Sequence, residues 1–173
     1  RDGLPVNWIS KVHKGTATLS IDSSLARTGK NSGRIESKVG GGAEFLMVRP
    51  VEPGEYLLSA WVRTKDIEGK NGVLLKVQGR GLQSKESAKL KGTNNEWQKL
   101  QINFRVDSQS GVLVFCLFGA WSEAKGTVWF DDVELFQLSS DKVIPEVTKV
   151  ESLLAKQAFE KGPEEMIKLV ELI

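Results

Sequence analysis

An all-β sandwich followed by a short helical extension is the fold class that the sequence predicts, on three observations. Between positions 8 and 136, short β-prone runs alternate with clusters of Gly, Asn, Asp and Ser, as strands alternate with turns. Within several runs, apolar and polar residues alternate with the period of two that a half-buried strand requires. After position 140, the apolar residues change to helical spacing.

The predicted strands cover 17–21, 32–38, 44–49, 54–64, 72–79, 97–106, 111–118 and 127–138. About eight strands in two antiparallel sheets is the composition of a jelly-roll β-sandwich. The glycine-rich stretch 40–44 falls between two of these strands. We interpret it as a flexible turn and not as a phosphate-binding loop, because it does not open a helix.

Alternation also assigns side chains to the inside or the outside of the sandwich. The strands 54–64, 72–79 and 97–106 each combine an apolar inner face with a polar outer face. The polar outer set, predicted to share one sheet face, comprises Trp61, Arg63, Gln78, Arg80, Gln101 and Asn103. The run 111–118 is apolar on both faces, which predicts a central strand with a buried Cys116.

The predicted domain boundary lies near position 140, with the sandwich in 1–140 and a helical extension, or a linker to a further domain, in 141–173. Apolar residues at helical spacing on both sides of Gly162 and Pro163 indicate two short amphipathic helices. The first residue is Arg1, and the last residues continue a predicted helix. We therefore expect a fragment of a multidomain protein whose natural signal and linked neighbouring domains lie outside this sequence.

Composition and charge exclude several function classes. The 24 basic and 22 acidic residues leave a net charge of +2 without a long Lys or Arg run, so nucleic acid is not an expected partner. No apolar stretch approaches the roughly 20 residues that span a bilayer, so no membrane span is expected.

Catalytic motifs are absent from the sequence. The single histidine, His13, stands in a polar stretch and is interpreted as solvent-exposed. Asp131 and Asp132 are neighbours in a predicted strand, so their carboxylates should point to opposite faces and could not flank one glycosidic bond. The sequence therefore predicts a protein that is not an enzyme.

Four segments in order, ARTGKNSGRIES (26–37), PGEYLLSAWVRTKDI (53–67), GTNNEWQKLQINF (92–104) and GTVWFDDVELF (126–136), carry a family resemblance. They resemble jelly-roll, galactose-binding-domain-like carbohydrate-binding modules of polysaccharide-degrading enzymes. The resemblance extends over most of residues 8–138. It implies the same sandwich fold and a polysaccharide or glycan ligand.

The resemblance also implies where ligands would bind. Sugars in such modules stack on aromatic rings while polar side chains bind their hydroxyls. Trp121, in a polar loop, and Trp61, which could instead fill the core, are the predicted rings. Trp97 and Trp129 are interpreted as core residues, and Trp8 as closing one end of the sandwich. One structural calcium ion is implied, with Asp131 or Asp132 as its carboxylate ligand together with backbone oxygens of 27–32; Asp2 is a weak substitute for the acidic ligand that the family adds from its N-terminal strand.

Three functions remain open at this point. The first is a non-catalytic carbohydrate-binding module of a secreted, extracellular or periplasmic, multidomain protein. The second is a structural or protein-interaction spacer without glycan affinity. The third, a small glycoside-processing enzyme, has the least support in the sequence.

Overall fold

The computed structural model describes residues 7–138, which form β-strands and no helix. The strands are β1 (Trp8–Gly15), β2 (Thr18–Asp22), β3 (Ser32–Val51), β4 (Gly54–Gly69), β5 (Val73–Gly79), β6 (Leu82–Glu86), β7 (Gly92–Val106), β8 (Ser110–Phe118) and β9 (Ala124–Leu138). Among these residues there is no helix that could cross a membrane. The predicted helical extension at 141–173 lies outside the described residues.

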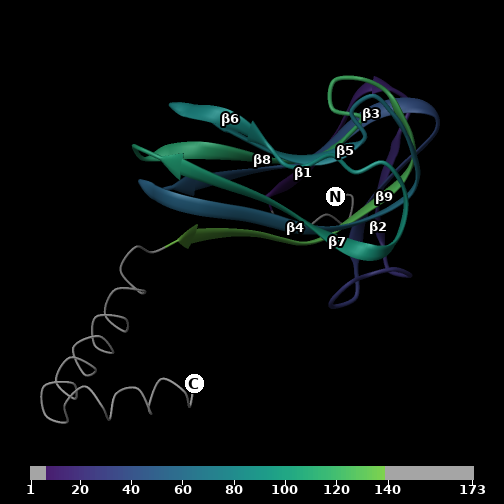
Figure 1. Ribbon diagram of the computed structural model, residues 1–173, viewed down its shortest axis with the longest axis horizontal. Helices are drawn as coiled ribbons and strands as arrows, with labels where there is room; N and C mark the ends of the chain where they lie inside the picture. The colour runs from purple at the N-terminus through teal and green to yellow at the C-terminus, as the bar shows by residue number, and fades with distance from the viewer. Residues whose placement is uncertain (1–6, 139–173) are drawn as a thin grey trace, which may run out of the picture. The chain divides into compact units, whose positions relative to one another are not determined.

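The strands form two antiparallel layers that face each other (Figure 1). The first sheet has the order β1–β3–β8–β5–β6, and the second has the order β2–β3–β9–β4–β7. Strand β3 belongs to both, because its residues 32–37 pair with β2 and β9 while its residues 43–51 pair with β8. The predicted β-sandwich is confirmed, with one long strand joining its two sheets.

The crossing point of β3 is the glycine-rich stretch, and the prediction of a flexible turn there is wrong. The two strands expected at 32–38 and 44–49 are one continuous strand. A Cβ atom at Gly41 would collide with the backbone carbonyl of Thr16, so only glycine allows this close approach of two chain segments. The glycines serve close packing where the strand changes sheets.

Two strands were not predicted, because their side chains are mostly exposed on both faces. Strand β1 lies at an edge of the first sheet, and β6 lies at the opposite edge. An edge strand that buries few side chains lacks the alternation of apolar and polar residues by which strands are predicted.

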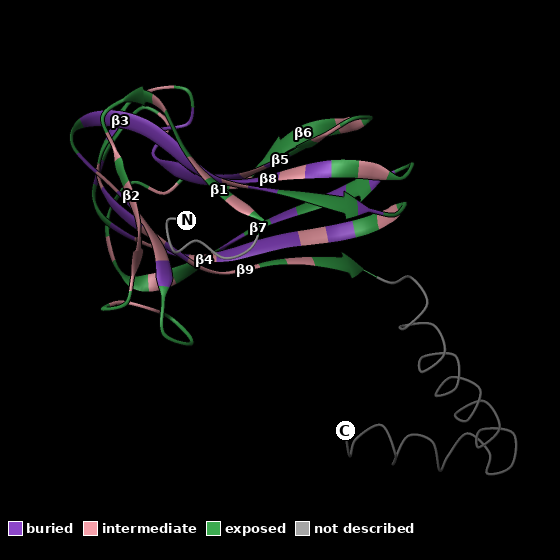
Figure 2. Cartoon of the chain, turned by 180° about the vertical axis from the view of Figure 1, so that it is seen from behind, coloured by how far each residue is buried: buried purple, intermediate pink, exposed green. Residues whose placement is uncertain are grey.

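The main core fills the space between the inner faces. Leu58, Val62, Val77, Phe104 and Val114 are among its fully or almost fully buried side chains. Buried residues follow the middle of the strands, while most loops are exposed (Figure 2). The predicted phase of β4, β5 and β7 is confirmed.

Two tryptophans, Trp97 and Trp129, lie outside the core positions that were predicted for them. Trp129 lies half-buried on the outer face of the second sheet, where its Nε1 donates a hydrogen bond of 2.8 Å to Asp22 Oδ2. Its neighbours Val128 and Phe130 occupy the inward positions, so alternation turns Trp129 outward. Trp97 is also half-buried and outside the core cluster. Trp8 packs against the core at an opening between the sheets, as expected.

Candidate functional site

The outer face of the first sheet carries an apolar cluster of its own. Leu74, Phe115, Leu117 and Ala120 are buried there, although they point away from the main core. Strand register puts Leu117 between Leu74 and Glu44, so a carboxylate borders the cluster. Because these apolar side chains are already covered, they support the residues that lie above them and do not themselves face a ligand.

Trp121 lies over this cluster from the loop between β8 and β9. Trp121 is 57% exposed, whereas its neighbour Ala120 belongs to the buried cluster. Ala120 and Trp121 adopt φ angles of 34° and 64°, in the left-handed region that a bulky side chain rarely enters. The backbone is thus held in a strained conformation that keeps a large aromatic ring at the surface.

Asn71 holds this strained loop in place. Its Nδ2 donates a hydrogen bond of 2.6 Å to the carbonyl of Ala120 and a longer one of 3.3 Å to Ser122 Oγ. Ser122 in turn donates from both its backbone nitrogen and its hydroxyl to the carbonyl of Gly119. The position of Trp121 therefore depends on a side chain from the β4–β5 connection.

His13 lies beneath the ring of Trp121, and the prediction that it is solvent-exposed is wrong. Lys11 pairs with Glu44 on the outer face, and His13, two residues further along β1, faces the same way, where its side chain is only 10% exposed. The two rings lie 5.3 Å apart between centroids. The ring fits there because residue 42 is glycine: a Cβ at Gly42 would come within 2.6 Å of His13 Nε2.

Glu44 is buried beside His13, and the pair leaves polar atoms without partners. Glu44 Oε2 lies 3.8 Å from His13 Nδ1, which is too far for a hydrogen bond. Both ring nitrogens of His13 and this carboxylate oxygen are buried and have no hydrogen-bond partner among the described residues. An unpaired buried polar group costs about 1–3 kcal/mol of folding free energy. A hydroxyl or water that formed hydrogen bonds with these atoms would therefore be stabilising.

Lys76 completes the site from β5. Its Nζ lies 5.2 Å from the centroid of the Trp121 ring and 3.9 Å from Glu86 Oε1. The side chain is only 13% exposed. We call Trp121, His13, Glu44 and Lys76 the Trp121 site.

The residues predicted to share one binding face lie on two. Trp61 and Arg63 on β4 lie on the outer face of the second sheet, next to Gln101 and Asn103 on β7. Gln78 lies on the outer face of the first sheet, opposite Leu113, and Arg80 lies in the β5–β6 turn. Only Trp121 belongs to the site described above.

Trp61 is half-buried and covered by another side chain. The guanidinium carbon of Arg27 lies 3.9 Å from its ring centroid, and Lys99 Nζ lies 6.0 Å from it. A ring that already stacks on a cation offers less surface to a sugar. The face around Trp61 is therefore the weaker of the two predicted platforms.

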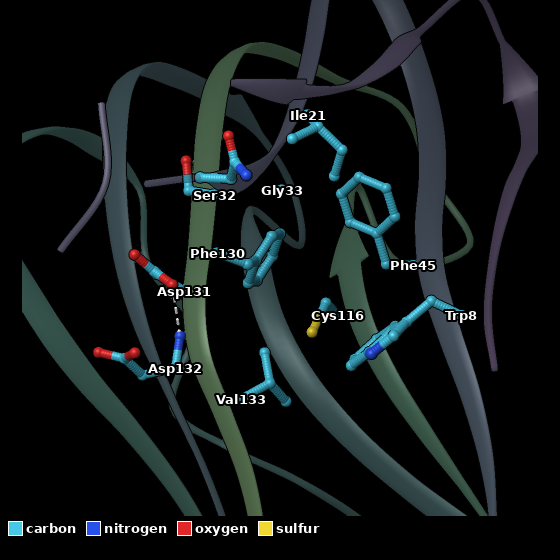
Figure 3. A pocket seen from close by; sticks show the side chains of 11 residues that line it. Trp8, Ile21, Ser32, Gly33, Phe45, Cys116, Phe130, Asp131, Asp132 and Val133 are labelled. Carbon is cyan, nitrogen blue, oxygen red and sulfur yellow. Dashed lines mark hydrogen bonds between the residues drawn. The ribbon is translucent and has the colours of Figure 1, made fainter. Parts of the chain in front are cut away.

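Asp131 and Asp132 point to the same side of β9, so the expected opposite orientation is wrong. Figure 3 shows both carboxylates turned away from Phe130 and Val133. Asp132 has a φ of 46°, and the register of β9 against β4 shifts at this point. A bulge of this kind interrupts the alternation on which the expectation rested.

The two carboxylates bind the loop between β2 and β3. Asp131 Oδ2 accepts the backbone N–H groups of Arg27 at 2.6 Å and Thr28 at 3.3 Å. Asp132 accepts the Arg27 guanidinium at 2.7 Å and the Thr28 hydroxyl. Burial pushes the pKa of Asp132 upward, but these two bonds outweigh it and hold the pKa below its usual range.

This corner is where the family resemblance implies a calcium ion. The loop turns N–H donors and a guanidinium toward the carboxylates, and such groups cannot ligate a cation. No group of three or more His, Cys, Asp or Glu side chains in the described part of the chain could hold a metal. The donor set as arranged does not fit calcium, and calcium binding stays an untested prediction.

A pocket of about 290 Å³ opens between the two sheets beside this corner. Trp8, Phe45, Cys116 and Phe130 line its inner part, and Asp131 and Asp132 lie at its margin (Figure 3). The Cys116 thiol is fully buried, and burial raises its pKa. A neutral buried thiol behaves as a small apolar side chain, so its role here is packing.

Solved structures with similar folds include carbohydrate-binding modules and a phage tailspike domain. TmCBM61, solved in complex with β-1,4-galactotriose, superimposes with a TM-score of 0.59 at 19% identity, over 77% of this chain and 90% of its own. The CBM22-1 xylan-binding domain of Paenibacillus barcinonensis Xyn10C gives 0.52 at 16% identity, over 78% and 87%. The chain has the fold of β-sandwich carbohydrate-binding modules.

The third similar structure shows how widely this fold is used. The enzymatically active domain of tailspike protein 4 from bacteriophage CBA120 gives a TM-score of 0.54 at 13% identity, over 77% of this chain but only 20% of its own. No protein-family model matches the chain, and no curated protein does. At these identities the similarity establishes the fold, and the function must be argued from the site.

Sequence reasoning missed His13, Glu44, Lys76 and Asn71. Glu44 and Lys76 were detectable only in part, as charged residues flanked by apolar ones inside strands. His13 is buried by a contact with the distant Trp121, and Asn71 acts through a loop contact, and neither has a local sequence signal.

Proposed function

We propose that the chain is a non-catalytic carbohydrate-binding module and that it binds a neutral glycan at the Trp121 site. The observation that carries this proposal is an exposed aromatic ring directly above buried polar groups that have no partner in the described part of the protein. A sugar ring has an apolar C–H face and hydroxyl edges, so it needs this combination of surfaces.

Each residue of the site has a distinct role in the proposed complex. The indole of Trp121 stacks on the apolar face of one sugar. A sugar hydroxyl donates a hydrogen bond to Glu44 Oε2, and His13 bonds a second hydroxyl. Because these atoms are buried beneath the ring, the indole must tilt before the hydroxyls can reach them.

The charge of the site favours a neutral sugar. Glu44 is almost completely buried, and an anionic uronate or sulfate group placed beside it would be repelled in a medium of low dielectric constant. Lys76 is 3.9 Å from Glu86, which reduces the attraction of this lysine for an anion. We expect β-1,4-galactan or xylan oligosaccharides, which the similar modules bind or are named for, to be the first ligands to test.

The proposed role places the protein outside the cytoplasm, where such polysaccharides occur, and attached to other domains. In that setting the module would keep a linked protein near its polysaccharide without breaking bonds. The catalytic alternative has little support, because Asp131 and Asp132 are engaged by Arg27 and Thr28.

Calorimetric titration of the 173-residue chain with galacto- and xylo-oligosaccharides tests the proposal. We expect Trp121→Ala and Glu44→Gln each to weaken binding by about tenfold or more, since each removes roughly 1.4 kcal/mol or more of interaction. Trp61→Ala is the matched control, and it should change the affinity less than about twofold.

Two results would overturn the assignment. If a Trp61→Ala variant that remains folded loses binding while Trp121→Ala does not, the glycan binds the second sheet. If no oligosaccharide or insoluble polysaccharide is retained by the wild-type chain, the sandwich is a spacer without glycan affinity.

A further inference from the structure

The β2–β3 loop is tied to β9 by the residues that were expected to hold calcium. Arg27 and Thr28 in this loop contact Asp131 and Asp132, more than 100 positions later in the chain. A structural calcium ion can hold a loop to a distant strand in this way, because it binds oxygen atoms from separate segments of the chain. The question is which group supplies the positive charge here.

All four carboxylate oxygens at this corner already accept hydrogen bonds. Asp131 Oδ1 accepts the backbone N–H of Asp132 at 2.8 Å, and its Oδ2 accepts two backbone N–H groups of the loop. Asp132 Oδ1 accepts the Thr28 hydroxyl, and its Oδ2 accepts Arg27 Nη1. A calcium ion needs six to eight oxygen ligands, and here it would have to break this network to gain the first four.

Arg27 is held on its other side by an aromatic ring. The guanidinium carbon lies 3.9 Å from the centroid of Trp61 on β4, while Nη1 lies 2.7 Å from Asp132 Oδ2 on β9. One side chain therefore connects the β2–β3 loop to two neighbouring strands of the second sheet. A guanidinium can do this because it is always charged and its flat face stacks while its N–H groups donate in the plane.

We propose that the Arg27 guanidinium takes the place of a structural cation and closes the β2–β3 loop on β9 without metal. The Arg27–Asp132 pair supplies the charge neutralisation, Trp61 positions the guanidinium, and the N–H groups on Asp131 fix the loop backbone. Trp61 then serves stability instead of glycan binding. The stability of the domain is consequently independent of calcium.

Thermal unfolding of the full chain tests this proposal. We expect the wild-type Tm to agree within about 1 °C between excess EDTA and about 5 mM CaCl2, because a ligand stabilises only the state it binds. Arg27→Ala and Asp132→Asn should each lower the Tm by roughly 3–8 °C, and the double variant should fall by less than their sum.

Arg105→Ala is the matched control. Arg105 also contacts two carboxylates, Glu55 and Asp107, but its side chain is 70% exposed, so its removal should leave the Tm nearly unchanged. If Arg27→Ala fails to fold, two measurements still test the proposal. The first is the wild-type Tm with EDTA and with calcium. The second is the Tm of Arg27→Lys, which should be lowered because an ammonium group keeps the charge but lacks the planar guanidinium that stacks and donates several hydrogen bonds.

Opposite results would overturn the proposal. A wild-type Tm that rises by several degrees with calcium, or sensitised terbium luminescence that calcium displaces, would show that the corner holds a metal ion. An Arg27→Ala variant as stable as the wild type would show that the guanidinium does not close the loop.

Discussion

At the residue scale, the Trp121 site depends on side chains that the fold holds in unfavourable states. Trp121 has a left-handed backbone, and His13 and Glu44 bury polar atoms that lack partners in the described structure. Neither arrangement stabilises the free protein, and a ligand could recover the part of the cost that comes from the unpaired polar atoms. This is the pattern expected of a binding site prepared before the ligand arrives.

Asn71 gives a direct test of the preparation of this site. Asn71→Ala removes both side-chain hydrogen bonds to the loop that carries Trp121, so the ring should lose its fixed position. We expect an affinity for the oligosaccharide that is about three- to tenfold lower, measured by calorimetry. Asn103→Ala, on the outer face of the second sheet, is the control and should bind as the wild type does. Equal affinities for Asn71→Ala and the wild type would show that the loop needs no such support.

The lowered pKa of Asp22 predicts how the free energy of unfolding depends on pH. Hydrogen bonds from Ser24 and from the Trp129 indole lower the pKa of Asp22 from 3.8 to about 2. Ionised Asp22 therefore stabilises the fold above about pH 4, and this contribution disappears as the pH falls toward 2. Because the group lies near the surface, solvent screening limits it to about 1 kcal/mol.

Denaturant unfolding of Asp22→Asn against the wild type measures this contribution. The stability difference should be largest near pH 7 and should shrink between about pH 4 and pH 2. Asp107→Asn removes an exposed carboxylate and should show little difference at any pH. A difference between Asp22→Asn and the wild type that does not change with pH would contradict the assignment.

At the scale of the elements, two irregularities shape the sandwich, and neither follows from sequence alternation. A register shift in β9 brings Asp131 and Asp132 to one side, and glycines carry β3 from one sheet to the other. Alternation predicted the inner faces of β4, β5 and β7 because their apolar side chains must be buried.

The same alternation could not say which sheet a strand joins. This is why Gln78 and Trp61 were expected on one face and lie on two. Bulges have no local pattern, since one inserted residue changes the phase without changing composition. Hence the fold and the exposure of Trp121 were predictable, whereas the burial of His13 and Glu44 required the structure.

The glycine crossing of β3 can be tested by single substitutions. At Gly41 a methyl group would collide with the Thr16 carbonyl, so Gly41→Ala should cost about 1–3 kcal/mol of folding free energy. At Gly111 the nearest atom to an added Cβ is Val48 Cγ1 at 4.0 Å, so Gly111→Ala should be nearly neutral. Chemical denaturation measures both, and equal stabilities would argue against a tight crossing.

At the scale of the whole sandwich, the two outer faces have different tasks. The first sheet carries an exposed ring above buried polar groups, whereas on the second sheet Trp61 stacks with Arg27 and the Trp129 indole is bonded to Asp22. A protein of this fold can therefore bind a ligand on the outer face of one sheet while side chains on the outer face of the other sheet hold its loops in place. The central claim is that the glycan contacts the first sheet only.

The tryptophan indole N–H signals in a ¹⁵N-correlated NMR spectrum test this claim most directly. During titration with β-1,4-galacto- or xylo-oligosaccharide, the account predicts that the indole signal of Trp121 shifts while those of Trp61 and Trp129 stay in place. Shifts at Trp61 and Trp129 with a stationary Trp121 signal would contradict it.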